Sequence, residues 1–177
     1  MALMAVGVLV CARPTVASLQ IGLALAVAGE CWRLWALGYS GEHTRSTEIS
    51  APTLITAGPF ARCRNPLYVG NTANSLGVAV AATGGWPWLS ALAIVLGCLA
   101  TLTMVYGCCI VAEEKFLRQK FGEEYREYCV RMARFSPFHS AHPSNNQGKF
   151  SFANLRFEKM TLVWWVLIWV YLWWRAC

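Results

Sequence analysis

The chain has 177 residues, of which 56% are hydrophobic and only 14% are charged, and its formal net charge is +6. Soluble domains carry about 25% charged residues, so the composition excludes an ordinary soluble domain. It predicts an all-α, polytopic membrane protein that forms one domain over residues 1–177. The nine Trp fit this prediction, because amphipathic rings collect at the two water–lipid interfaces.

Five apolar runs predict the membrane helices. A spanning helix needs about 20 residues, with a range of roughly 17–25. The runs at 16–37 and 88–112 meet this length, and the run at 67–83 meets it marginally. The runs at 2–12 and 160–174 are short and need their flanks or a tilt to span. We therefore predict five transmembrane helices, or four if the first run lies in the interface.

The second run contains two ionisable residues, Glu30 and Arg33, which lie three apart and therefore on one helical face. Ionisable groups at this depth are costly and usually face a partner or a cavity. Either the two residues pair, with Arg33 snorkelling to the interface, or one of them lines a polar pocket. Both are candidate substrate-binding residues.

The third helix follows a loop over residues 38–65 that Gly and Pro residues punctuate. We expect it to start at Asn65-Pro66, because the residue before Pro avoids the helical region and Pro suits a first turn. Small residues share one face of this helix, where they permit close helix packing or the approach of a cofactor. They are Gly70, Ala73, Gly77 and Ala81.

The fourth helix is predicted to continue past the membrane edge. Helical spacing persists from Glu113 to Lys120, and Gly122 follows as a stop. A second, amphipathic segment over 123–134 then places aromatic and apolar residues on one face, either as part of a site or as an interfacial helix. These residues are Tyr125, Tyr128 and Met132.

Basic residues set the predicted orientation. They concentrate in the loop at 38–65 and above all in residues 112–159, whereas the connection at 84–87 has no charge. The positive-inside rule then places the N-terminus and both polar regions in the cytoplasm, on the same face of the membrane. A cofactor-binding region on the cytoplasmic face is the natural consequence.

Several partners are not expected. The positive charge is spread through loops where topology explains it, so we expect contact with anionic lipid headgroups and no nucleic-acid binding. The eight Cys show no C-x-x-C pair and no grouping with His, so the sequence predicts neither a metal site nor a disulfide framework.

Two polar stretches beside apolar runs carry the strongest functional signal. One is Gly58-Pro59-Phe60 followed by Arg64-Asn65-Pro66-Leu67-Tyr68-Val69-Gly70, and the other is Glu113-Glu114 followed by Phe121-Gly122-x-x-Tyr125-x-x-Tyr128-x-x-Arg131. Together they resemble the signatures of the isoprenylcysteine carboxyl methyltransferases and their bacterial relatives. The resemblance covers roughly residues 22–137 and is closer to bacterial members, since the eukaryotic enzymes have His in place of Asn65. It implies an integral membrane methyltransferase that uses S-adenosylmethionine, related to the phospholipid methyltransferases.

The resemblance also implies site residues. The cofactor site falls on Arg64, Asn65, Pro66, Tyr68, Gly70, Glu113 and Glu114. The substrate-side arginines fall on Arg64 and Arg131, and Arg134 is a further substrate-binding candidate. Arg64, Arg131 and Glu114 are the candidate catalytic residues. Their chemistry suits the cofactor, because Glu pairs with an amino group and Arg with a carboxylate.

The methyl acceptor leaves alternatives open. A carboxylate nucleophile needs a cation to hold it and no base. The many Arg residues on the predicted cytoplasmic face favour such an acceptor, for example an isoprenylcysteine or another lipophilic carboxylate. An amine acceptor, as in phospholipid N-methylation, needs a base, for which Glu30, Glu114 and Tyr68 are candidates. A sterol-reductase-like enzyme that uses NADPH is a second alternative, although no basic cluster for a 2′-phosphate follows Gly70. A membrane scaffold would explain the hydropathy but not two polar signatures on one face.

Overall fold

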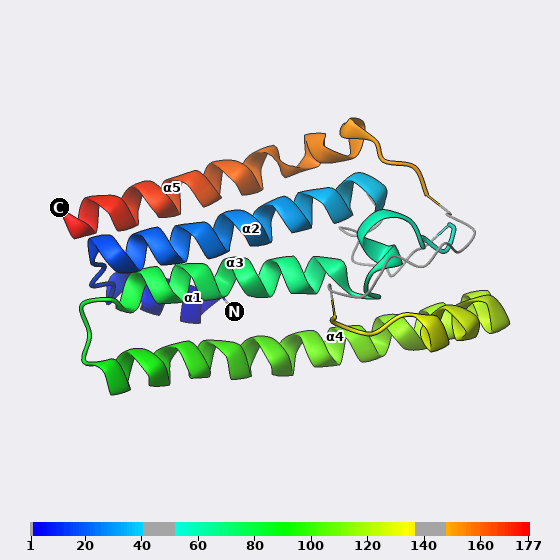
Figure 1. Cartoon of the computed structure of the whole chain (residues 1–177), viewed down its shortest axis with the longest axis horizontal. Coiled ribbons are helices and arrows are strands. Elements are labelled where there is room, and N and C mark those ends of the chain that lie inside the picture. The colour runs from blue at the N-terminus through cyan, green and yellow to red at the C-terminus, as the bar shows by residue number, and fades with distance from the viewer. Residues whose placement is uncertain (1, 41–51, 137–147) are drawn as a thin grey trace. The chain divides into compact units, whose positions relative to one another are not determined.

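The computed structural model describes residues 2–40, 52–136 and 148–177. Its helices are α1 (Ala2–Val10), α2 (Val16–Ser40), α3 (Pro66–Thr83), α4 (Trp88–Arg131) and α5 (Lys159–Ala176), and two short 3-10 helices are η2 (Gly58–Ala61) and η3 (Phe152–Glu158) (Figure 1). No strand occurs in these described ranges, so the all-α prediction is confirmed. Each predicted apolar run coincides with one of the five α-helices.

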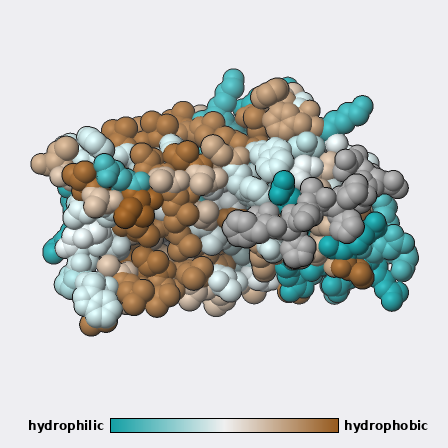
Figure 2. All heavy atoms as spheres, viewed as in Figure 1, coloured by the Kyte–Doolittle hydropathy of each residue, from teal (hydrophilic) through white to brown (hydrophobic). Residues whose placement is uncertain are grey.

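Two of the described helices, α2 and α4, are long and apolar enough to cross a membrane. Only 17% of the most apolar window of α4 is buried by the rest of the chain, and its exposed side chains include Leu89, Leu92, Leu96 and Met104. Figure 2 shows hydrophobic side chains covering much of the face in view. Exposed apolar surface of this extent is unfavourable in water and favourable in lipid, which indicates an integral membrane protein. The topology of five spans stays a prediction, since α3 and α5 have 18 residues each and do not meet the same test.

The described chain divides into two compact units. Unit 1 comprises Met1–Glu30, Asn71–Val105 and Glu158–Cys177, and unit 2 comprises Cys31–Gly70 and Tyr106–Phe157. The sequence predicted a single domain. That remains a prediction, because α2, α3 and α4 contribute residues to both units.

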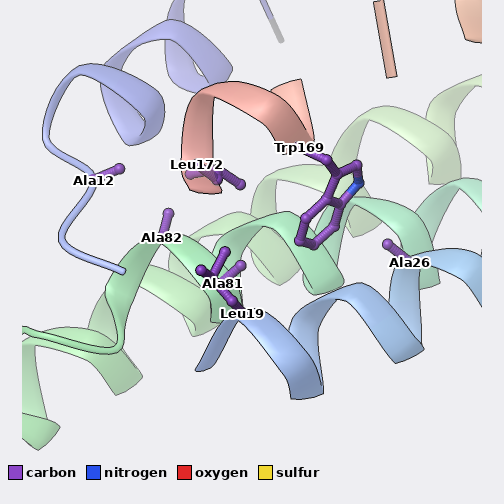
Figure 3. Packing of buried hydrophobic residues seen from close by; sticks show 7 residues of the cluster. All are labelled: Ala12, Leu19, Ala26, Ala81, Ala82, Trp169 and Leu172. Carbon is purple, nitrogen blue, oxygen red and sulfur yellow. The ribbon is translucent and has the colours of Figure 1, made fainter. Parts of the chain in front are cut away.

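Small residues bring α2 and α3 together within unit 1. A Cβ atom added at Gly77 would lie 2.5 Å from the carbonyl oxygen of Gly22 and 2.8 Å from the Cβ of Ala26, so only glycine fits. The close packing expected of the small-residue face is therefore found at Gly77. Around this contact lies an apolar core made of Ala12, Leu19, Ala26, Ala81, Ala82, Trp169 and Leu172 (Figure 3).

A reciprocal cap starts α2 in unit 1. The backbone N–H of Thr15 donates to Ser18 Oγ at 2.9 Å, and the N–H of Ser18 donates to Thr15 Oγ1 at 3.2 Å. Two backbone donors that the first helical turn cannot satisfy are thereby paired, which typically stabilises a helix by about 1 kcal/mol. Ser18 Oγ also donates to the Ala81 carbonyl at 3.0 Å, so the cap joins α2 to α3.

A break at Gly122 shapes the last part of α4 in unit 2. Its φ of 53° and ψ of −119° are not helical, so the helix stops there and restarts at Glu123, as the sequence predicted. The restarted segment buries Tyr125, Tyr128 and Met132 against Leu54. The predicted apolar face of this segment is confirmed, and it packs against the chain itself.

Candidate active site

The loop before α3 is tied to the end of α4. Gly58 has a φ of 61°, which favours glycine, and Pro59 sits in the first turn of η2. The backbone N–H of Arg64 donates to the Ala133 carbonyl at 2.9 Å, and Tyr128 Oη donates to the Phe60 carbonyl at 2.8 Å. These two bonds hold the Arg64 backbone beside residues that lie about 70 positions away in the sequence.

Asn65 reinforces this connection and starts the helix. Its side-chain Nδ2 donates to the Arg134 carbonyl at 3.2 Å, and its backbone carbonyl accepts the N–H of Val69 at 3.2 Å. Pro66 then occupies the first position of α3, as predicted, and is fully buried. One residue therefore fixes both the end of the α4 region and the start of α3.

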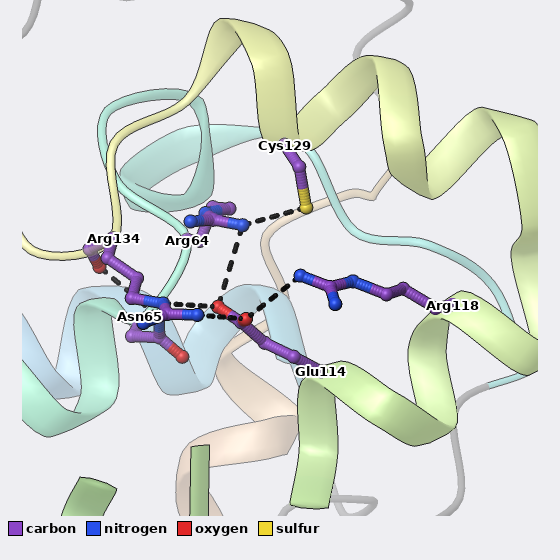
Figure 4. Close-up of polar contacts among 6 residues, drawn as sticks. All are labelled: Arg64, Asn65, Glu114, Arg118, Cys129 and Arg134. Carbon is purple, nitrogen blue, oxygen red and sulfur yellow. Dashed lines mark hydrogen bonds and ion pairs between the residues drawn. The ribbon is translucent and has the colours of Figure 1, made fainter. Parts of the chain in front are cut away.

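Glu114 is the centre of a charged cluster. Arg134 donates to it with two nitrogens, Nε at 2.9 Å and Nη2 at 2.7 Å, in the bidentate geometry that makes such pairs strong. Arg64 Nη1 and Arg118 Nη2 each lie 3.5 Å from the same carboxylate. Figure 4 shows the three arginines pointing toward Glu114 from separate parts of the fold.

The cluster fixes the charge of Glu114. Its side chain is only 5% exposed, and burial alone would raise the pKa of the carboxyl group. The hydrogen bonds from Arg134 and the charges of Arg64, Arg134 and Arg118 outweigh that effect and lower the pKa below its ordinary value. Glu114 is therefore a fixed negative charge that orients arginines, and it is poorly suited to accept a proton.

Arg64 has hydrogen-bonding capacity to spare. Its Nη1 donates to Cys129 Sγ at 2.7 Å, a weak acceptor, in addition to the ion pair with Glu114. Its Nε atom is buried and has no hydrogen-bond partner among the described residues. A buried donor without a partner is costly, and a ligand anion placed beside it would remove that cost.

Tyr68 and Glu113 form a second polar pair in unit 2. Tyr68 Oη donates to Glu113 Oε1 at 2.7 Å, and the rings of Tyr68 and Tyr106 lie 4.8 Å apart between centroids. The predicted site residue Gly70 is buried two residues further along α3. This pair offers a carboxylate and two aromatic faces, the groups that suit a ligand ammonium or sulfonium.

A pocket of about 570 Å³ opens at the Gly122 break. Its lining shares Arg118 and Cys129 with the charged cluster. The full lining is Arg118, Gly122, Glu123, Arg126, Cys129 and Val130. The break in α4 therefore creates space next to the arginines.

The structure does not bring every predicted residue into the cluster. Arg131 donates to the carboxylate of Glu127 at 3.1 Å, four residues earlier on the same helix, and is 42% exposed. Glu30 belongs to unit 1, where its carboxylate accepts a hydrogen bond from Asn74 Nδ2 at 2.9 Å. Arg33 belongs to unit 2 and is buried. The roles assigned to these three residues stay predictions.

Two members of the cluster were missed in the sequence. Arg118 lies four residues after Glu114 on one helix, so the i, i+4 spacing was an available signal. Cys129 contacts Arg64 from 65 residues away, and nothing local in the sequence marks that contact. The part of the chain that the structure describes has no group of three or more His, Cys or Glu that could hold a metal ion.

Comparisons with known proteins show the family of the chain. The phospholipid methyltransferase family model matches residues 15–124. The cobalt-zinc-cadmium resistance protein CzcN of Cupriavidus metallidurans is 31% identical over 118 residues, covering 67% of this chain and 47% of that protein. The protein-S-isoprenylcysteine O-methyltransferase of Mus musculus is 30% identical over 129 residues, covering 66% of this chain and 40% of that protein.

The matched region has clear limits. The chain spans less than half the length of these two relatives. No solved structure matches it. The family match nevertheless includes Arg64, Glu114 and Arg118 of the charged cluster and extends over more than half of the chain. The chain belongs to the phospholipid methyltransferase family.

Proposed function

We propose that this protein transfers a methyl group from S-adenosylmethionine to a lipophilic acceptor at the edge of a membrane. Family membership and the similarity to an isoprenylcysteine O-methyltransferase support a methyltransferase. The observation that carries the proposal further is the arginine cluster around Glu114, in which Arg64 keeps a buried donor without a partner.

The residues of unit 2 fit the cofactor by their chemistry. S-adenosylmethionine presents a carboxylate, an amino group, a sulfonium and an adenine. The free Nε of Arg64 suits the carboxylate, and Glu113 suits the amino group. The rings of Tyr68 and Tyr106 suit the sulfonium or the adenine.

The acceptor that the cluster favours is a carboxylate. Three arginines surround one glutamate, so the cluster has an excess of positive charge that an anion would balance. Arg118 and Arg134 are 60% and 46% exposed, which leaves their guanidinium groups accessible. Arg is suited to hold a carboxylate because its planar fork matches the two oxygens.

The chemistry makes modest demands on the protein. S-adenosylmethionine supplies an electrophilic methyl group whose bond to sulfur breaks as the bond to the acceptor oxygen forms. The bonding pair returns to sulfur, and no proton moves when the acceptor is a carboxylate. The arginines hold and orient the acceptor, which is the main source of rate in an in-line displacement. Glu114 acts as a positioning residue that keeps Arg64 and Arg134 in place.

A phospholipid amine is the second candidate acceptor, because the family that matches is named for phospholipid methylation. An amine must lose a proton before or during attack, so this reaction needs a base. Glu114 is ill suited, since its pKa is lowered by the arginines that outweigh its burial. Glu113 directly precedes Glu114 in the sequence, and its described partner is the Tyr68 hydroxyl and not an arginine. It is therefore the base that we assign to this alternative.

We further propose that the protein is a multi-pass membrane protein with this site on the cytoplasmic face. The basic residues of 112–159 support the orientation through the positive-inside rule. The exposed apolar side chains of α4 support the membrane location. Labelling single-Cys variants from either side of sealed vesicles would test the orientation, and labelling of residue 120 from the outside alone would contradict it.

One assay distinguishes the acceptors. The purified protein is incubated with methyl-labelled S-adenosylmethionine and either a farnesylated cysteine derivative or phosphatidylethanolamine. We expect label in a base-labile methyl ester of the first substrate. Label in the amine headgroup alone would show that the acceptor is the phospholipid amine and not the carboxylate. Label in neither substrate, from folded protein that binds S-adenosylhomocysteine, would exclude both acceptors.

A further inference from the structure

Two arginines of unit 1 lie outside the proposed chemistry, in or beside the connection that joins α1 to α2. The backbone of this connection is locked to the turn after α3. The N–H of Arg13 donates to the Ala82 carbonyl at 2.8 Å, and the N–H of Gly85 donates to the Arg13 carbonyl at 2.6 Å. Trp86 Nε1 donates to the Cys11 carbonyl at 3.1 Å. These bonds fix where the Arg13 side chain begins.

Both guanidinium groups are attached to this locked stretch. The Arg13 guanidinium lies over the Trp86 ring, 5.0 Å from its centroid. Arg175, in the last turn of α5, donates from Nη2 to the carbonyl of Ala12 at 2.7 Å, one residue before Arg13. Figure 3 shows Ala12 beside Ala82 and Leu172, which places the last turns of α3 and α5 at this connection. A guanidinium has five donors, so most of those on Arg175 remain available.

The two positive charges have no described negative partner. The described carboxylate side chains of unit 1 are Glu30 and Glu158, and both are buried. No ion pair joins either of them to Arg13 or Arg175 in the described part of the chain. In unit 2, by contrast, the charged cluster has its own carboxylate.

The residues around the two arginines are of a kind typical of a water–lipid interface. Exposed Trp residues lie near these contacts in the sequence, two residues after Trp86 at the start of α4 and directly before Arg175 at the end of α5. They are Trp88, Trp173 and Trp174, which are 72%, 62% and 70% exposed. Trp collects at the headgroup level, where phosphate groups also lie. Arg binds phosphate with particular strength because it can donate two parallel hydrogen bonds.

We propose that Arg13 and Arg175 bind the phosphate of an anionic phospholipid headgroup. This site is separate from the proposed methyl transfer and does not depend on it. The stacked Trp86 ring holds Arg13 in place, and the Ala12 carbonyl holds Arg175 in place, so little side-chain freedom remains to be lost on binding.

Native mass spectrometry of the full chain tests the proposal. The protein is mixed with equal amounts of phosphatidylglycerol and phosphatidylcholine, and the bound lipids are counted. We expect the wild type to retain phosphatidylglycerol preferentially. The double variant R13Q/R175Q should lose about tenfold or more of that preference, because basic residues near the headgroups supply the attraction. The matched control is K115Q/K120Q, which removes two exposed charges from unit 2 outside the pocket lining and should keep the preference.

Two further measurements distinguish a lipid phosphate from free phosphate and keep the test valid if the variant does not fold. Sodium phosphate should displace the lipid no better than sodium chloride at equal ionic strength, and selective displacement would assign the site to free phosphate instead. If R13Q/R175Q does not fold, the wild-type preference itself must fall as salt rises, since the attraction is screened. A wild type without preference, an unchanged R13Q/R175Q, or a preference independent of salt would overturn the proposal.

Discussion

The interactions that stabilise the interior of unit 1 differ from those that stabilise the interior of unit 2. Unit 1 depends on shape: glycine and alanine let α2 and α3 touch, and its core is apolar. Unit 2 depends on charge and hydroxyl groups, with three arginines on Glu114 and tyrosines bonded to a carbonyl and a carboxylate. In lipid, close packing of small residues stabilises helix contacts, but the lipid offers no partner for a buried charge. Charged groups beside apolar helices are therefore costly, and they indicate a functional site.

Removing the centre of the polar cluster should have the largest effect. Glu114→Gln leaves Arg64 and Arg134 without their anion, and breaking a buried pair from one side costs about 3–5 kcal/mol. Because Arg134 and Arg118 are partly exposed, we expect the lower end, about 3 kcal/mol. Unfolding in denaturant would measure it, and binding of S-adenosylhomocysteine should be lost as well. Unchanged stability would show that the cluster does not hold unit 2 together.

Arg64→Gln should mainly affect binding. A hydrogen bond to a charged ligand group contributes about 1.5–3 kcal/mol, so the affinity for S-adenosylhomocysteine should fall by roughly 10- to 100-fold. Calorimetric titration would measure this change. The control is Lys120→Gln, an exposed lysine of unit 2 that does not line the pocket. Equal losses in both variants would mean that total charge, and not Arg64, determines the affinity.

Unit 1 should lose stability when a larger side chain is placed where α2 and α3 touch. Gly77→Val places a side chain against the Gly22 backbone and should cost about 1–3 kcal/mol or more. Gly97→Val is the matched control, because nothing lies within 4 Å of a Cβ atom there, and it should be nearly neutral. Thermal unfolding of the two variants in the same detergent gives the comparison. Similar melting temperatures would contradict the close contact of α2 and α3.

Acid should weaken unit 2 through Glu114. Its pKa is lowered in the folded state because the arginines outweigh the effect of burial, so its contribution to stability is complete above the ordinary glutamate pKa of about 4.3. That contribution is lost as the pH falls below this value toward the folded pKa. The difference in melting temperature between wild type and Glu114→Gln should therefore shrink below about pH 4. A constant difference down to pH 3 would be inconsistent with an ion-paired Glu114.

The smallest effect should follow from Arg131→Gln. Its partner is Glu127 on the same exposed face, and such pairs contribute about 0.3–0.5 kcal/mol. Arg134→Gln removes the bidentate contact with Glu114 and should reduce turnover far more than Arg131→Gln does. Steady-state kinetics of both variants would decide between them. A dominant effect of Arg131→Gln would restore the substrate-side role that the family resemblance implies for it.

The sequence predicted most of the helices because apolar runs of membrane length carry their own boundary signals. It also predicted the break at Gly122, where a glycine follows a helical repeat. Four of the predicted site residues are in contact in the structure, and their roles stay predictions; they are Arg64, Asn65, Glu114 and Arg134.

The remainder depended on geometry that no local pattern contains. The helix α4 ends at Arg131, whose side chain pairs with Glu127. Arg134 lies only three positions later, beyond the helix end, and its side chain bonds to Glu114. Spacing rules apply only while the backbone stays helical. Cys129 contacts Arg64 through the fold of the intervening chain, which sequence periodicity does not describe.

Titration of the detergent-solubilised full chain with S-adenosylhomocysteine, with NADPH as the parallel control, tests the central claim most directly. We predict saturable binding of S-adenosylhomocysteine that Arg64→Gln weakens, and no binding of NADPH. Binding of NADPH alone would move the protein to the reductases. Binding of neither, by protein shown to be folded, would contradict the methyltransferase assignment of the arginine cluster.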